Sequence, residues 1–164
     1  MGTDTISFIS KDKWLVRDLY RFFQALNIFY NRLYVFNLFL RKGYRSFKNT
    51  LSFSLYYIEI GDELTVESLA MQSPAEFNLR GVSEIIAQIR EAFKDRKFRN
   101  RQEEQFGEIE LMRGKILLMK EAGYSEKEIK AIIKMLIQPV KKIQKQFYEN
   151  DIKLIEDKPE DKLD

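Results

Sequence analysis

The sequence predicts an α+β fold: a long N-terminal amphipathic aromatic helix, a small antiparallel β-meander of two to three strands, and a helical C-terminal part. Three changes of pattern support this fold class. Apolar residues recur at helical spacing up to residue 40, alternate with polar residues between 51 and 80, and return to helical spacing from residue 82. Because 164 residues correspond to one ordinary domain, we expect residues 1–155 to form a single domain.

The first predicted element is a helix over residues 10–42. Its apolar residues are spaced alternately four and three positions apart, with no Gly or Pro between them. This heptad-like seam consists of Leu15, Leu19, Phe22, Leu26, Phe29, Leu33, Phe36 and Leu40. Arg41 and Lys42, followed by Gly43, are typical of a helix C-terminus. The spacing resembles a coiled coil, so the seam is suited to the core or to a partner helix.

Residues 50–80 show the period of two that is typical of strands. We expect one strand over 51–60, a turn at Gly61, a second strand over 64–71 and a third over 75–80. Each would have one apolar face, which must be covered because a small sheet is not stable alone. The aromatic helix is the expected cover.

Residues 82–122 allow two interpretations. Apolar residues recur at helical spacing at both ends of this segment, but residues 94–105 are almost wholly polar. One continuous helix would be about 60 Å long at 1.5 Å per residue. The expected radius of gyration of a globular chain of this length is about 15 Å, so such a helix would protrude as an arm that needs a partner. Two helices packed as a hairpin would need none.

The C-terminal part carries clear helix boundary signals. Gly123 is placed as a helix C-cap, and Ser125 with Glu128 forms a capping-box pattern. We expect short helices over 125–149, the second beginning at Pro139. A further edge strand is expected over 151–155. The charged residues 156–164 are expected to form a disordered tail.

The composition argues against most catalytic mechanisms. The chain contains no Cys and no His, the residues that most often serve as nucleophile, general base or metal ligand. Its densest acidic group is Glu59, Asp62, Glu63 and Glu67, which surrounds the predicted turn at Gly61. Acidic residues are common in exposed turns, so we interpret this group as a solvated turn. We therefore expect a non-enzymatic protein with no cofactor and no metal.

A basic tract suggests nucleic-acid binding as the alternative function. Phosphate neutralisation together with aromatic stacking is what single-stranded nucleic acid requires. The tract lies within residues 90–101 and interleaves with Phe93 and Phe98. Its basic residues are Arg90, Lys94, Arg96, Lys97, Arg99 and Arg101. Neighbouring acidic residues and a net charge of only +3 favour a solvated helix surface instead.

The leading functional hypothesis is an interaction protein that assembles with itself or with another protein. Residues 1–50 carry nine basic and three acidic side chains, whereas residues 51–80 carry one basic and five acidic side chains. These blocks are complementary, within the fold or between copies. The predicted partner-binding residues are Phe93, Phe98, Phe106, Ile109, Met112 and Ile116.

The expected location is cytoplasmic. No run of about 18 uncharged apolar residues occurs, so we expect no transmembrane segment. Contact with a membrane surface, through the aromatic residues and the basic residues near Arg41, is less favoured than contact with a protein.

Overall fold

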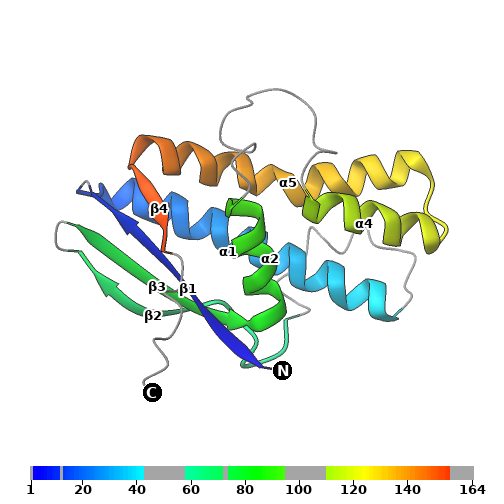
Figure 1. Ribbon diagram of the computed structural model, residues 1–164, viewed down its shortest axis with the longest axis horizontal. Coiled ribbons are helices and arrows are strands. Elements are labelled where there is room, and N and C mark those ends of the chain that lie inside the picture. The colour runs from blue at the N-terminus through cyan, green and yellow to red at the C-terminus, as the bar shows by residue number, and fades with distance from the viewer. Residues whose placement is uncertain (1, 12, 43–57, 72–73, 95–109, 156–164) are drawn as a thin grey trace, which may run out of the picture.

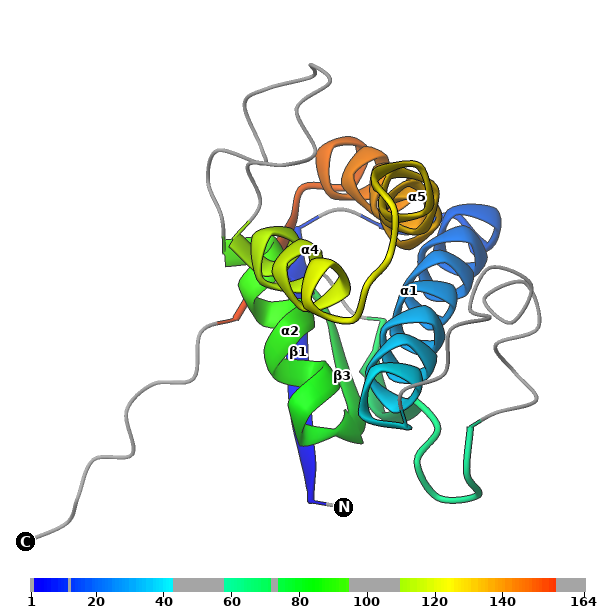
Figure 2. The same cartoon turned by 90° about the vertical axis from the view of Figure 1, so that its right-hand side faces the viewer.

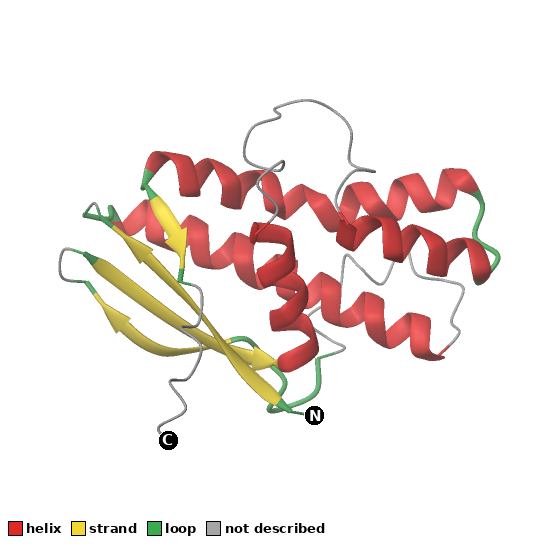
Figure 3. Cartoon of the chain, in the orientation of Figure 1, coloured by secondary structure: helices red, strands yellow, loops and turns green. Residues whose placement is uncertain are grey.

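The computed structural model describes residues 2–11, 13–42, 58–71, 74–94 and 110–155. Within these residues the chain forms four helices and a four-stranded antiparallel sheet, which confirms the α+β class (Figures 1 and 3). The elements are β1 (Thr3–Ser10), α1 (Val16–Lys42), β2 (Thr65–Ala70), β3 (Ala75–Val82), α2 (Ser83–Lys94), α4 (Glu110–Glu121), α5 (Glu126–Glu149) and β4 (Ile152–Leu154).

The strand order is β2-β3-β1-β4, with β1 inside the sheet. β1 was not predicted from the sequence, and the predicted start of the helix at residue 10 is wrong, because α1 begins at Val16. Ile6 and Phe8 alternate with polar residues, but two apolar positions are a weak signal by themselves. β1 pairs along its whole length with β3, from Thr3 opposite Val82 to Ser10 opposite Ala75, and the helices that cover this face of the sheet bury Ile6 and Phe8.

In place of the predicted meander, β2 and β3 form a hairpin, and β1 and β4 complete the sheet. β2 and β3 occupy the second and third predicted strands, and they pair with a register shift between Val66 and Ser68. Most of the strand predicted over 51–60 lies outside the described residues, and residues 58–60 are not in a strand. On its other side β3 pairs with β1. The C-terminal edge strand is confirmed as β4, which also pairs with β1.

A layer of helices covers one face of this sheet. α1 and α5 run side by side in opposite directions, while α2 crosses in front of them and packs on β1 and β3 (Figures 1 and 2). Phe8 and Phe77 are directly opposite each other on the covered face. Their rings contact Phe22 of α1, at centroid distances of 5.5 and 6.2 Å, and Phe8 also contacts Phe147 of α5 at 5.7 Å.

The interpretation of residues 82–122 as one continuous helix is wrong. In such a helix the end of α2 and the start of α4, sixteen residues apart, would be separated by about 24 Å. The structure instead has α2 and α4 as two helices in contact with each other, and α4 also packs against α5 (Figure 1). The long arm that suggested a partner is therefore not present as an extended helix.

The capping signals before residue 129 are confirmed. The Ser125 side chain accepts a hydrogen bond from the backbone N–H of Glu128, and the Glu128 carboxylate accepts one from the backbone N–H of Ser125. Gly123 has a φ of +84°, a conformation that favours glycine at a helix end. The predicted tail over 156–164 lies outside the described residues.

The prediction of short helices over 125–149 is wrong, because α5 continues through Pro139. Proline has no N–H, so the carbonyl of Met135, four residues earlier, loses its helical partner. The Arg32 guanidinium of α1 donates a 2.5 Å hydrogen bond to this carbonyl. A donor from a neighbouring helix thus replaces the missing one and ties α1 to α5.

Tyr30 of α1 fixes the helix to the sheet in a similar way. Its hydroxyl accepts a hydrogen bond from the buried Val82 N–H at 2.8 Å and donates one to the Asp62 carbonyl at 2.6 Å. Its ring lies so close to β3 that a Cβ at Gly81 would be 2.6 Å from Tyr30 Cε2. Glycine at position 81 is therefore required by the approach of this ring.

We expect the Tyr30→Phe substitution to lower the free energy of unfolding by about 1–3 kcal/mol, because it leaves the buried Val82 N–H without an acceptor. Urea unfolding followed by circular dichroism measures this change. Tyr148→Phe is the matched control, since Tyr148 is 91% exposed. Equal stability of both variants would contradict the importance of the Tyr30 hydroxyl.

We also expect Arg32→Met to destabilise the protein by about 1–3 kcal/mol, because the Met135 carbonyl would lose its donor. The loss should be smaller in a Pro139→Ala background, where the residue 139 N–H can bond to that carbonyl. A double-mutant cycle by chemical denaturation measures the difference. Additive effects of the two substitutions would show that Arg32 does not compensate for the proline.

Candidate functional site

A polar cluster connects α1, α2 and α4. The Lys115 ammonium of α4 donates a 3.0 Å hydrogen bond to Asn37 Oδ1 of α1, and it lies 4.5 Å from the centroid of the Phe36 ring. Asn37 Nδ2 in turn donates to Glu84 Oε1 of α2 at 3.2 Å. Arg41 forms an ion pair with the other oxygen of Glu84. These contacts, which we call the three-helix polar cluster, hold the three helices together.

Lys115 is the most perturbed basic group of this cluster. Only 4% of the residue is exposed. Burial lowers the pKa of its ammonium to about 8, although the negative charges of Glu84 and Glu91 act in the opposite direction. An amine with a lowered pKa is a candidate nucleophile or general base, because part of it is unprotonated near neutral pH.

The surroundings of Lys115 support a structural role more strongly than a catalytic one. The amine is buried, it donates to Asn37, and it lies against the Phe36 ring. A nucleophile needs room beside it for a substrate and groups that stabilise developing charge. The contacts of Lys115 with Asn37 and with the Phe36 ring instead join α4 to α1.

Three of the four acidic residues near the turn at Gly61 have different hydrogen-bond partners. Asp62 accepts a 2.7 Å hydrogen bond from the Tyr34 hydroxyl, and Glu63 accepts one from the Gly61 N–H at 2.6 Å. Glu67 lies on β2, where it accepts a hydrogen bond from Thr5. Among the described residues, acidic side chains do not gather in groups of three or more that could hold a metal ion.

Tyr34 is the most perturbed group near this turn. Burial raises the pKa of the Tyr34 hydroxyl, and its hydrogen bond to the Asp62 carboxylate raises that pKa further. The hydroxyl therefore stays protonated and remains a donor to Asp62. Together with Tyr30 it fastens the turn to α1.

The structure places two of the predicted partner-binding residues in the core. Phe93 and Met112 are buried, and Ile116 packs partly against the same core. Phe98, Phe106 and Ile109 lie outside the described residues. Helical spacing correctly identified the apolar side of α2 and α4, but in both helices this side faces the protein's own core. Phe93 and Met112 are therefore not available to a partner.

Arg90, the first residue of the predicted nucleic-acid tract, binds within the protein. It forms a 2.7 Å ion pair with Asp4 of β1 and donates a hydrogen bond to the Thr5 carbonyl. These bonds anchor α2 to β1. The side chain of Lys94 and the residues Arg96, Lys97, Arg99 and Arg101 lie outside the described part of the chain. Arg90 therefore does not contribute to a free basic tract.

Two surfaces were missed by the sequence analysis. The first is the edge of the sheet at β2, where Val66 and Leu69 are exposed. The second is the solvent side of α5, where Lys130, Lys134 and Lys141 are exposed. The lysine spacing was visible in the sequence as intervals of four and seven residues, which correspond to one side of a helix. The alternation over residues 64–71 predicted a strand, but not its place at one end of the described sheet.

We expect Lys115→Met to change the pH dependence of stability. Because folding lowers the pKa of Lys115 from 10.5 to about 8, the unfolded chain binds more protons between these values. The free energy of unfolding of the wild type should therefore rise relative to the variant from pH 8 to 10.5, by about 3 kcal/mol at most.

Urea unfolding at a series of pH values measures this difference. Lys120→Met, at an exposed position of the same helix, is the control and should show no such change. A difference between wild type and Lys115→Met that is constant with pH would contradict the lowered pKa.

No helix among the described residues is both long and apolar enough to cross a membrane. Comparison of the chain with protein-family models, with curated proteins and with solved structures finds no significant match. The functional argument therefore rests on the surfaces and contacts of this chain.

Proposed function

We propose that the protein is a non-enzymatic interaction protein of the cytoplasm that assembles with a second copy of itself through β2. The observation that carries this proposal is the apolar surface at that edge of the sheet. Among the strands of the described residues β2 lies at one end of the order, and all six of its residues are exposed. An edge strand with apolar side chains is a site for strand addition.

The apolar residues of β2 lie on the face that is buried elsewhere in the sheet. Val66 is opposite Leu79, and Leu69 is opposite Phe77. Leu79 and Phe77 are 1% and 0% exposed, whereas Val66 and Leu69 are 53% and 45% exposed. The apolar face of the sheet thus extends beyond the helices that cover it. Association of two such edges would remove this surface from water.

The sequence of β2 is complementary to itself in an antiparallel pair. A two-fold axis between residues 67 and 68 would place Val66 opposite Leu69 of the second copy, and Leu69 opposite Val66. It would place Glu67 opposite Ser68, so that like charges do not face each other across the axis. Such an interface uses the same surface on both copies, as expected of a two-fold dimer.

The charge of Glu67 is held on its own chain. Its carboxylate accepts a hydrogen bond from the Thr5 hydroxyl at 2.9 Å and lies 3.8 Å from the Arg80 guanidinium. Thr5 is on β1 and Arg80 is on β3, so both partners belong to the same sheet. The register shift beside Glu67 divides β2 into two short segments, which limits the pairing length. We therefore expect a dimer in the micromolar range or weaker.

Leu69→Lys tests the proposal. The substitution should convert a concentration-dependent dimer to a monomer, because it places a charge on the apolar surface that the two copies share. Light scattering after size-exclusion chromatography, over a range of protein concentrations, measures the molar mass. Leu117→Lys is the matched control, since Leu117 is 58% exposed on α4, and it should leave the dimer unchanged.

A wild-type protein that stays monomeric at high concentration would contradict the proposal. An equal loss of the dimer in both variants would also contradict it, because the interface would then lie elsewhere. Circular dichroism of each variant verifies that the fold is retained.

A further inference from the structure

We propose that the solvent side of α5 is a binding surface for single-stranded nucleic acid. This surface is distinct from β2 and from the tract over residues 90–101. It consists of a line of exposed lysines, which we call the α5 lysine row. The row comprises Lys127, Lys130, Lys134, Lys141 and Lys145.

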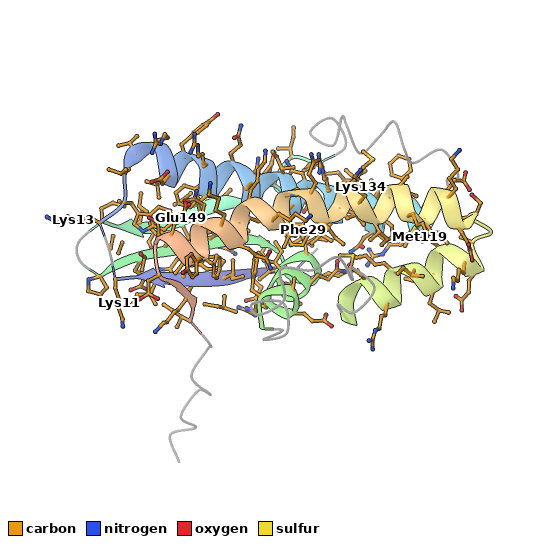
Figure 4. The ribbon with its side chains drawn as sticks, turned by 90° about the horizontal axis from the view of Figure 1, so that it is seen from above. Lys11, Lys13, Phe29, Met119, Lys134 and Glu149 are labelled. Atoms are coloured by element: carbon orange, nitrogen blue, oxygen red, sulfur yellow. The ribbon has the colours of Figure 1, made fainter. Side chains whose placement is uncertain are left out.

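The lysines of the row lie on one side of α5. Successive members are three, four, seven and four residues apart, which keeps them within a narrow sector of the helix. The opposite side carries the buried residues that face the core, Ile129, Ile132, Ile133, Leu136, Ile137, Val140 and Ile143. Figure 4 looks down on the α1 and α5 layer, with Lys134 labelled on α5.

The acidic residues of α5 itself are confined to the two ends of the helix. No Asp or Glu occurs between Lys130 and Lys145. At the start of the helix, Glu128 is engaged in the capping box with Ser125. At its end, Glu149 lies 3.6 Å from the Lys145 ammonium. The middle of the row therefore has a positive potential that no acidic residue of α5 interrupts.

α1 adds basic charge beside the row. The two helices are antiparallel, and the contact of Arg32 with the Met135 carbonyl gives their relative position. When the same number of residues is counted away from this contact along both helices, the first turns of α1 come to lie next to the last turns of α5. Arg21 is exposed in this part of α1, where Asp18 is the acidic neighbour and lies 3.6 Å from Arg17.

The length of the row matches a stretch of nucleic-acid backbone. From Lys127 to Lys145 the helix rises about 27 Å at 1.5 Å per residue. Ammonium groups spaced along this length can neutralise several consecutive phosphates, and each such contact releases counterions. Contacts of this kind position a strand without reading its sequence. We therefore expect binding that depends on salt and little on base composition.

Tyr148 favours a single strand over a duplex. It is three residues after Lys145 and seven after Lys141, so it lies on the same side of α5, and it is 91% exposed. An exposed aromatic ring beside cations can stack on an unpaired base. α5 is also flanked by α1 and α4, which prevents it from entering a major groove.

The side chains of the row fit nucleic acid better than a membrane surface. A helix that lies on a bilayer inserts an apolar face between the lipids. The apolar face of α5 is buried in the core. Between Lys130 and Lys145 the exposed residues of α5 are Lys or Gln. Between Lys130 and Lys145 the surface therefore offers charges that attract phosphate and no exposed apolar side chain of α5 for insertion.

The double variant Lys134→Glu and Lys141→Glu tests the proposal. Binding of a labelled oligothymidine of about 20 nucleotides is measured by fluorescence anisotropy between about 50 and 200 mM potassium chloride. We expect the double variant to bind more than tenfold more weakly. The slope of log K against log salt should fall by about 0.7 for each lysine removed.

Two further variants separate the surface from general charge effects. Lys120→Glu with Lys153→Glu makes the same change in net charge on α4 and β4, and should alter binding less than twofold. Tyr148→Ala should weaken binding of the oligothymidine about fivefold or more with an unchanged salt slope, because stacking releases no counterions.

The proposal would be overturned if the wild type did not bind the oligothymidine at low salt. An equal loss of binding in the control double variant would also overturn it. So would a protein that co-sediments with vesicles of anionic lipid but does not bind the oligonucleotide. Thermal unfolding of all variants verifies that lost binding is not lost folding.

Discussion

The rest of the structure depends on the burial of one aromatic ring, that of Phe8. Its ring contacts Phe22 of α1, Phe93 of α2 and Phe147 of α5, at centroid distances of 5.5, 6.2 and 5.7 Å. Three helices that are distant in the sequence therefore meet at one side chain of β1. Edge-to-face contacts of this kind add to the stabilisation from apolar burial. They also set the direction of approach of each helix, which apolar burial alone does not.

Polar contacts then set the position of the helices along the sheet. The Tyr30 hydroxyl binds the backbone of β3 at Val82, and the Arg32 guanidinium binds the backbone of α5 at Met135. Both side chains leave α1 within one turn of each other, toward different neighbours. One bond satisfies the buried Val82 N–H and the other the partly buried Met135 carbonyl, and a shift of α1 along its axis would break both. α1 is thus held at one place in the core, while the solvent side of α5 and the edge at β2 remain uncovered.

Local patterns predicted those elements whose stability is local. The helical spacing from Leu15 onward, the capping box at Ser125 and the hairpin of β2 and β3 are each encoded within a few residues. β1 and the continuous α5 were not predicted, because each depends on a distant partner: β1 on β3, and Pro139 on Arg32. The candidate site was harder to predict from the sequence than the fold. Apolar spacing shows which side of a helix avoids water, but not whether the protein's own core or another molecule covers that side. Phe93 and Met112 were therefore predicted to bind a partner, although they face the core.

The position of β4 beside β1 has a consequence for synthesis of the chain. Ser10 donates a hydrogen bond to the Asn150 carbonyl, and the Ile155 N–H donates one to the Ser7 carbonyl at 2.9 Å. β1 therefore completes its hydrogen bonding only when residues more than a hundred positions later in the chain have been synthesised. Until then Phe8 has no Phe147 to contact. Until Ile152–Leu154 are synthesised, the nascent chain therefore carries a β1 strand with one edge unpaired.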